Sequence, residues 1–177
     1  MKRLSALLSL ALLLGLLVAP VSAQPKEVVI GVMYPMSGPS GQAGVDNKAV
    51  FELAQDIANG AVDIPYPFYQ RLKGMPGLKG AKVRLIFTDH QGKPDLGQAE
   101  AERLISQEKV VALVGSWHSA VTATASQVAE RSGTPFMNPE SSSPPLTRRG
   151  FKWFFRTSPH DEHFTQVMFD FFRDFQK

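Results

Sequence analysis

The chain has 177 residues and no cysteine, and its 19 basic and 16 acidic side chains give a formal charge of +3. This length suits one domain with a sizeable core, and the lack of cysteine excludes disulfides, a thiol nucleophile and cysteine metal sites. Without Lys2 and Arg3, 17 basic and 16 acidic residues leave a charge of +1. That balance does not indicate a nucleic-acid or membrane-surface partner.

Residues 1–23 have the pattern of a secretory signal peptide. Two basic residues precede a leucine-rich run at 4–18, and small residues at 21–23 form a cleavage site ahead of Gln24. The apolar run of about 15 residues is shorter than the ~20 that span a bilayer. We therefore expect cleavage rather than anchoring, and an exported, periplasmic protein whose single ligand-binding lobe covers residues 24–177.

Beyond this segment, apolar periodicity predicts alternating strands and helices. The predicted strands are residues 27–33, 82–88, 110–114, 134–137 and 151–156. The predicted helices are residues 45–58, 94–107, 120–131 and a last helix with Ser158 as its cap and Pro159 at its first position. Segments 34–44, 62–79 and 140–150 are rich in Gly, Pro or Ser and are expected to be loops. This order predicts an α/β fold with a doubly wound, mostly parallel sheet.

Two polar clusters, residues 116–119 and 138–143, follow successive predicted strands. Ligands of such sheets bind outside the carboxyl ends of the strands. Free N–H groups at a helix start attract an anion, and Ser119 adds a hydroxyl there. Glu140 would suit an ammonium group, and Trp117 would cover an apolar part, so together they resemble an amino-acid site. The alternative is that Ser119 is only a helix cap and Glu140 a solvated loop residue.

An enzyme is a weaker interpretation of the same clusters. Ser116, His118, Ser119 and Glu140 include the residue types of a hydrolase triad. The sequence GSWHS does not match the GxSxG motif, however, and adjacent Ser and His residues on one turn rarely reach the required hydrogen bond. We therefore expect no catalysis.

Nucleotide and metal sites are also weakly indicated. The loop at 34–44 has neither GxGxxG nor GxxxxGK[ST]. His160 and His163 have the spacing of a metal pair beside two acidic residues, but a capped, charged helix start explains them as well. We expect neither a metal nor another cofactor.

Four stretches of the sequence resemble one known family. They are IGVMYPMSGPSGQAG, the turn from Asp89 to Pro94, VVALVGSWHSAVTATAS and TPFMNPESSSPPLTRRGFKWFFRTSP. In this order they resemble the branched-chain amino-acid binding proteins of ABC importers, which are leucine-binding-protein-like members of the type I periplasmic binding proteins. The resemblance covers essentially the whole chain after residue 23.

The resemblance implies two α/β lobes that close on a small ligand and deliver it to a membrane permease. It also implies about twice this length, so we expect the second lobe to be absent here. The ligand-binding positions that it implies are Ser37, Gln42, Trp117, His118, Ser119, Glu140, Ser141 and Ser142. Ala43 and Glu140 depart from the usual pattern, so an amine, amide or polar amino acid is expected at least as readily as leucine. A sensor or regulatory receptor of the same fold is the alternative.

Overall fold

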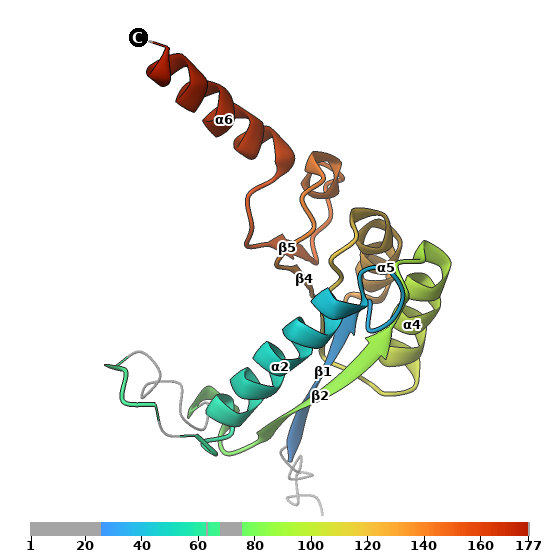
Figure 1. The fold of residues 1–177 in the computed structure, drawn as a ribbon. Coiled ribbons are helices and arrows are strands. Elements are labelled where there is room, and N and C mark those ends of the chain that lie inside the picture. Colours follow the sequence, from blue (N-terminus) through green and yellow to red (C-terminus); the bar gives the residue numbers. More distant parts are fainter. Residues whose placement is uncertain (1–25, 63, 68–75, 177) are drawn as a thin grey trace, which may run out of the picture.

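The computed structural model describes residues 26–62, 64–67 and 76–176 (Figure 1). The predicted signal peptide and its cleavage point before Gln24 lie outside these residues. No helix in the described part of the chain is both long and apolar enough to cross a membrane.

Five parallel strands form one sheet in the order β2-β1-β3-β4-β5. The strands are β1 (Glu27–Tyr34), β2 (Lys82–Asp89), β3 (Ala112–Gly115), β4 (Phe136–Asn138) and β5 (Phe154–Arg156). The chain moves from β1 to β2 on one side and then crosses β1 to place β3 on the other. This reversal confirms the predicted doubly wound parallel sheet.

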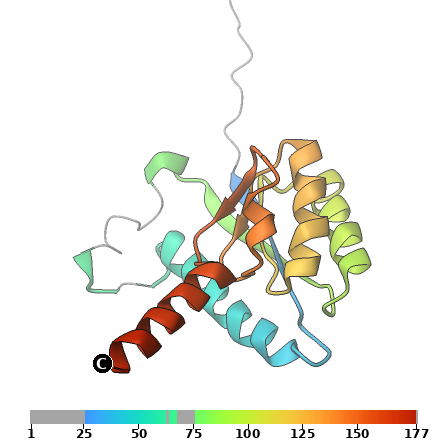
Figure 2. The ribbon, with the colours of Figure 1, turned by 90° about the horizontal axis from the view of Figure 1, so that it is seen from above.

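Helices cover the two faces of the sheet unequally (Figures 1 and 2). The helices are α2 (Gly41–Ala58), α4 (Pro94–Ser106), α5 (Ser119–Ser132) and α6 (Asp161–Phe175), with 3-10 turns at Pro76–Leu78 and Pro144–Thr147. Helices α4 and α5 pack on the face that carries Leu113 and Phe136. Helix α2 lies against the opposite face, and on that face Met137 and Phe155 are exposed.

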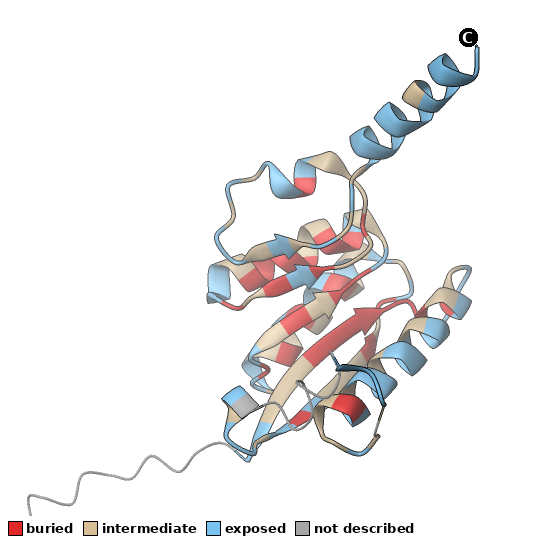
Figure 3. Ribbon diagram, turned by 90° about the vertical axis from the view of Figure 1, so that its left-hand side faces the viewer, coloured by how far each residue is buried: buried red, intermediate tan, exposed pale blue. Residues whose placement is uncertain are grey.

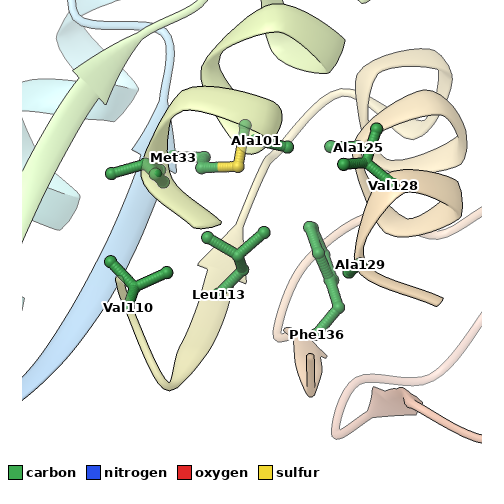
Figure 4. Packing of buried hydrophobic residues seen from close by; sticks show 9 residues of the cluster. Met33, Ala101, Val110, Leu113, Ala125, Val128, Ala129 and Phe136 are labelled. Atoms are coloured by element: carbon green, nitrogen blue, oxygen red, sulfur yellow. The ribbon is translucent and has the colours of Figure 1, made fainter. Parts of the chain in front are cut away.

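The core lies between the sheet and helices α4 and α5 (Figure 4). Its buried members are Met33, Ala101, Leu104, Val110, Leu113, Ala125, Val128, Ala129 and Phe136. Gly97 of α4 sits so close to α5 that a Cβ atom there would lie 2.3 Å from Cγ1 of Val121. Small residues therefore let the two helices approach each other closely.

The start of α2 differs from the prediction. The helix begins at Gly41 rather than at residue 45. Glycine disfavours helices, which is why the sequence pattern indicated a loop. A Cβ atom on Gly44 would lie 2.0 Å from the carbonyl oxygen of Pro35, so a glycine is what allows this first turn to pack on the preceding backbone.

Two C-terminal predictions also need correction. The last helix has His160 as its N-cap, not Ser158, and the N–H of Asp161 donates to the carbonyl of Ser142. Strand β5 begins three residues later than predicted because the N–H groups of Lys152 and Trp153 donate to the carboxylate of Glu130. The other predicted helices and strands are confirmed, with ends shifted by one or two residues.

Helix α6 projects away from the sheet, and none of its residues is buried (Figure 3). Its apolar face is exposed and consists of Phe164, Val167, Met168, Phe171, Phe172 and Phe175. The predicted aromatic face is thus present, but within the described residues nothing covers it.

Candidate functional site

The sheet reverses its order at β1, because β2 and β3 flank that strand on opposite sides. At such a point the loops that leave neighbouring strands diverge and open a crevice at the carboxyl edge of the sheet. Here the loop after Tyr34 and the turn after Gly115 leave the strands on either side of that point. The fold therefore places one of the two predicted polar clusters directly beside the expected ligand position.

The turn after β3 has a constrained backbone. A Cβ atom at Gly115 would lie 2.2 Å from the carbonyl oxygen of Met33, so only glycine fits there. The N–H of His118 donates to the carbonyl of Ser116 at 2.9 Å, with Trp117 between them at φ 73°. This is a γ-turn with positive φ at its centre, which is the rarer and strained form. Strain of this kind is concentrated at functional sites, and Trp117 is 42% exposed.

A buried chain of hydroxyl groups joins the two predicted clusters. Oγ of Ser116 lies 2.9 Å from Oγ1 of Thr122, which lies 2.6 Å from Oγ of Ser141. The Ser141 hydroxyl also donates to the carbonyl of Trp117 at 3.0 Å. The structure thus uses Ser141, a predicted ligand residue, to hold the strained turn in place.

Ser119, His118 and Ser142 lie at the same edge. Ser119 is the first residue of α5, and its Oγ accepts a hydrogen bond from the N–H of Ser143 at 3.3 Å. His118 is the N-cap of α5, and its Nε2 lies 3.3 Å from Oγ of Ser40. The carbonyl of Ser142 accepts the N–H of Asp161. The alternative in which Ser119 is the N-cap is therefore wrong by one residue.

Ser37 and Gln42 have their polar groups occupied by nearby acids. The Ser37 hydroxyl donates to Oδ2 of Asp89 at 2.6 Å, and Gln42 donates to Asp46 one helical turn ahead. Partial burial raises the pKa of Asp89, but hydrogen bonds from Ser37 and from the N–H groups of Gln91 and Met36 outweigh it and hold that pKa below its usual value. Asp89 therefore stays ionised and fixes the loop after β1.

Glu140 faces Tyr34, which the sequence did not indicate as a site residue. Burial raises the pKa of the Tyr34 phenol, and the neighbouring Glu140 carboxylate raises it further. The Tyr34 hydroxyl lies close enough to this carboxylate for a hydrogen bond between them to contribute to the shift, although neither that hydroxyl nor Oε2 of Glu140, both buried, has a partner of ordinary hydrogen-bond geometry among the described residues. Oε2 of Glu140, the predicted acceptor for an ammonium group, is thus buried and can accept a further hydrogen bond.

Similar polar atoms gather beyond all five strands. Buried polar side-chain atoms without a partner in the described part of the chain belong to Tyr34, Thr88, His118, Glu140, Arg156, Ser158 and His160. Each residue lies at or within a few positions of the carboxyl end of a strand. Most buried polar atoms in proteins are paired, so this concentration makes the edge a candidate binding surface. Only the end of the sheet unites these residues, which is why sequence spacing missed most of them.

The hydrogen bonds observed at this edge do not fit the hydrolase interpretation. His118 bonds to Ser40, whereas Ser116 bonds to Thr122 and Ser119 to Ser143. Nδ1 of His118 has no partner among the described residues, so no acid there orients the ring as a triad requires.

The histidine pair of the metal interpretation lies at the start of α6. The rings of His160 and His163 stack with centroids 3.7 Å apart, and the N–H of His160 donates to Nδ1 of His163 at 3.4 Å. The described residues contain no cluster of three or more potential metal ligands. The pair is accounted for by the capping of the helix.

A family profile described as a periplasmic binding protein matches residues 27–177. The chain belongs to this family. A Leu/Ile/Val-binding protein homolog of Brucella melitensis is 34% identical over 94% of this chain and 37% of its own length. An amino acid binding protein of Pseudomonas aeruginosa is 30% identical over 77% of this chain and 33% of its own length. The chain thus spans about a third of these curated relatives.

Solved structures of binding proteins share the fold. The branched-chain amino acid transporter substrate binding protein LivJ of Streptococcus pneumoniae, in complex with isoleucine, has a TM-score of 0.64 at 24% identity, over 76% of this chain and 34% of that one. A solute binding protein of Rhodopseudomonas palustris, in complex with 3,4-dihydroxybenzoic acid, has a TM-score of 0.62 at 20% identity, over 76% and 32%. At these identities the likeness concerns the fold.

Proposed function

We propose that residues 24–177 are the first lobe of an extracytoplasmic solute-binding protein that serves an ABC importer and performs no catalysis. The family match and the names of the relatives support this role. The concentration of unpartnered buried polar atoms at the carboxyl edge carries the proposal, because it offers a ligand hydrogen bonds that the lobe itself leaves unmade. Docking to a membrane permease is part of this proposed role.

We propose an amino acid, or a related compound with an amine and an acid group, as the ligand. The start of α5 with Ser119 and Ser142 would hold the carboxylate, and Glu140 would hold the amine through its spare oxygen. Trp117 would cover the side chain. His118, Ser141, Ser37 and Gln42 line or brace the same edge and are assigned supporting roles. A second lobe, as the family resemblance implies, would supply the opposite wall.

Native mass spectrometry of the protein from an exporting host tests this proposal first. It reports the chain length, removal of residues 1–23 and the mass of any retained ligand in one spectrum. A retained mass that fits an amino acid supports the proposal. A retained aromatic acid without an amine contradicts the assignment of Glu140.

Calorimetry with a panel of amino acids and 4-hydroxybenzoate then tests the residues. A hydrogen bond to a charged group contributes about 1.5–3 kcal/mol, so Glu140→Gln should weaken binding of an amino acid roughly 10- to 100-fold. Ser119→Ala should weaken it too, whereas Ser106→Ala, which removes an exposed hydrogen bond to the carbonyl of Glu102 at the end of α4, serves as the matched control. If Ser119→Ala and Glu140→Ala together leave affinity unchanged, the site is wrong.

A further inference from the structure

His90 is a buried histidine that the proposed ligand contacts leave unused. It directly follows β2 and is 0% exposed. Its N–H donates to the carbonyl of Tyr34, and its own carbonyl accepts the N–H of Lys93. Its backbone is therefore integrated into the end of β1 and the turn before α4.

The ring of His90 bridges two loops. Nε2 lies 3.0 Å from the carbonyl oxygen of Ser116, and the N–H of Gly92 donates to Nδ1 at 3.1 Å. A carbonyl oxygen can only accept and a backbone N–H can only donate. Nε2 must therefore carry the proton while Nδ1 is bare, so the two contacts together require the neutral ring in a single tautomer.

The Ser116 carbonyl is a critical acceptor. It also accepts the N–H of His118 that closes the strained γ-turn around Trp117. His90 thus supplies the second hydrogen bond to the oxygen on which this turn depends. Trp117, whose indole is proposed to cover the ligand, is the central residue of that turn.

A third loop joins the same cluster through His118. The rings of His90 and His118 lie edge to face with centroids 5.8 Å apart, and His118 reaches Ser40 in the loop before α2. Gly92 packs closely on the His118 ring: a Cβ atom at Gly92 would lie 3.2 Å from two atoms of that ring. Loops after β1, β2 and β3 therefore meet at the two imidazoles.

We infer that His90 is a positioning residue for the proposed site: its neutral ring accepts from Gly92 and donates to Ser116, which fixes the turn after β2 against the turn that carries Trp117, and a proton on Nδ1 breaks the Gly92 contact and so displaces the ring. A protonated Nδ1 would face the donating N–H of Gly92, and the new charge would be buried. The inference rests on the proposed function for the identity of the site, but the two ring contacts themselves need no ligand.

The groups around the ring favour the neutral form. Burial lowers the pKa of His90, and the neighbouring His118 lowers it further, whereas the Ser116 carbonyl and Asp89 oppose this shift without cancelling it. The ring is therefore neutral near pH 7, and the turn of Trp117 should rearrange only in acid.

NMR spectroscopy of the isotope-labelled chain without ligand tests the inference across the histidine range, from about pH 8 to pH 5. We expect the His90 ring in the Nε2–H tautomer at high pH. On acidification, the amide signals of Gly92 and Trp117 should move with the His90 ring at one shared midpoint below 6.5. An Nδ1–H tautomer, or Trp117 signals that move independently of His90, would overturn the inference.

Three variants sharpen this test. His90→Gln retains a donor for Ser116 but cannot titrate, so the shared transition should vanish. His118→Gln and His163→Gln should retain it, the latter because His163 lies on exposed α6. Survival of the transition in His90→Gln overturns the inference; if that variant does not fold, the titration of the unaltered chain decides alone. Intact coupling without binding of any tested amino acid would count against the proposed function only.

Discussion

Helices α5 and α6 have 14 and 15 residues but lie in opposite environments. Helix α5 is built largely from small residues, and its buried positions are Val121, Thr122, Ala125, Ser126, Val128 and Ala129. Helix α6 carries five phenylalanines and buries nothing. Burial in the described part of the chain therefore follows how closely a helix can approach its neighbours, and not how apolar its sequence is.

The attachments of the two helices explain the contrast. Helix α5 ends in a left-handed cap at Gly133, and its Ser126 is held by Arg149. Helix α6 is held near its first turn, where Asp161 donates to Ser142 and Glu162 pairs with Arg148. A helix with so wide an apolar face normally lies against another layer.

The largest change in the free energy of unfolding is expected at one of two contrasting phenylalanines. Phe136 is fully buried beneath α5, so Phe136→Ala should lower the free energy of unfolding by about 3–5 kcal/mol. Phe175 on α6 is 76% exposed, so Phe175→Ala should change it by less than about 0.5 kcal/mol. Urea denaturation followed by circular dichroism measures both. A comparable loss in the two variants would mean that α6 is packed in solution.

A medium effect is expected where α4 meets α5. Alanine normally stabilises a helix relative to glycine, but at Gly97 the new methyl would lie 2.3 Å from Val121. Overpacking of this kind should cost about 1–3 kcal/mol. Gly77 has no atom within 4 Å of such a methyl, so Gly77→Ala is the matched control. Stabilisation by Gly97→Ala in thermal unfolding would show that the two helices are less tightly packed.

The smallest change in stability is expected from protonation of His90 at low pH. The folded-state pKa of His90 lies below its unfolded value of 6.5, so the unfolded chain binds this proton first as pH falls. The contribution of His90 to stability is complete above pH 6.5 and is lost below it as the folded pKa is approached. His90→Gln should flatten that part of a plot of melting temperature against pH, and His163→Gln on α6 should not. A slope unchanged by His90→Gln would refute this.

Much of the fold was predictable because periodicity is local. The apolar run at β1 and the small-residue pattern of α5 both predicted their elements, and the βαβ order predicted the parallel sheet. The start of α2 was missed because Gly41 and Gly44 look unfavourable until the close backbone of Pro35 is known. The cap of α6 was missed because it depends on a carbonyl at Ser142.

The predicted site shows the same division. Ser119 and Glu140 stood out because they follow successive strands, and the structure does bring their two clusters together through Ser141 and Thr122. No pattern in the sequence indicated Tyr34 or His90 as site residues. Each acts through a residue about 26 or more positions away, Glu140 for Tyr34 and Ser116 for His90, so no local spacing could reveal them.

The sequence alone determined the α/β class, the order of the elements and the segments that carry the polar clusters, because these depend on short-range patterns of apolar and turn-forming residues. The tertiary structure decided which hydroxyls remain available, which histidine is locked in one tautomer and which helix stays uncovered. Those properties depend on hydrogen-bond partners and burial that arise only when distant strand ends meet at one edge of the sheet.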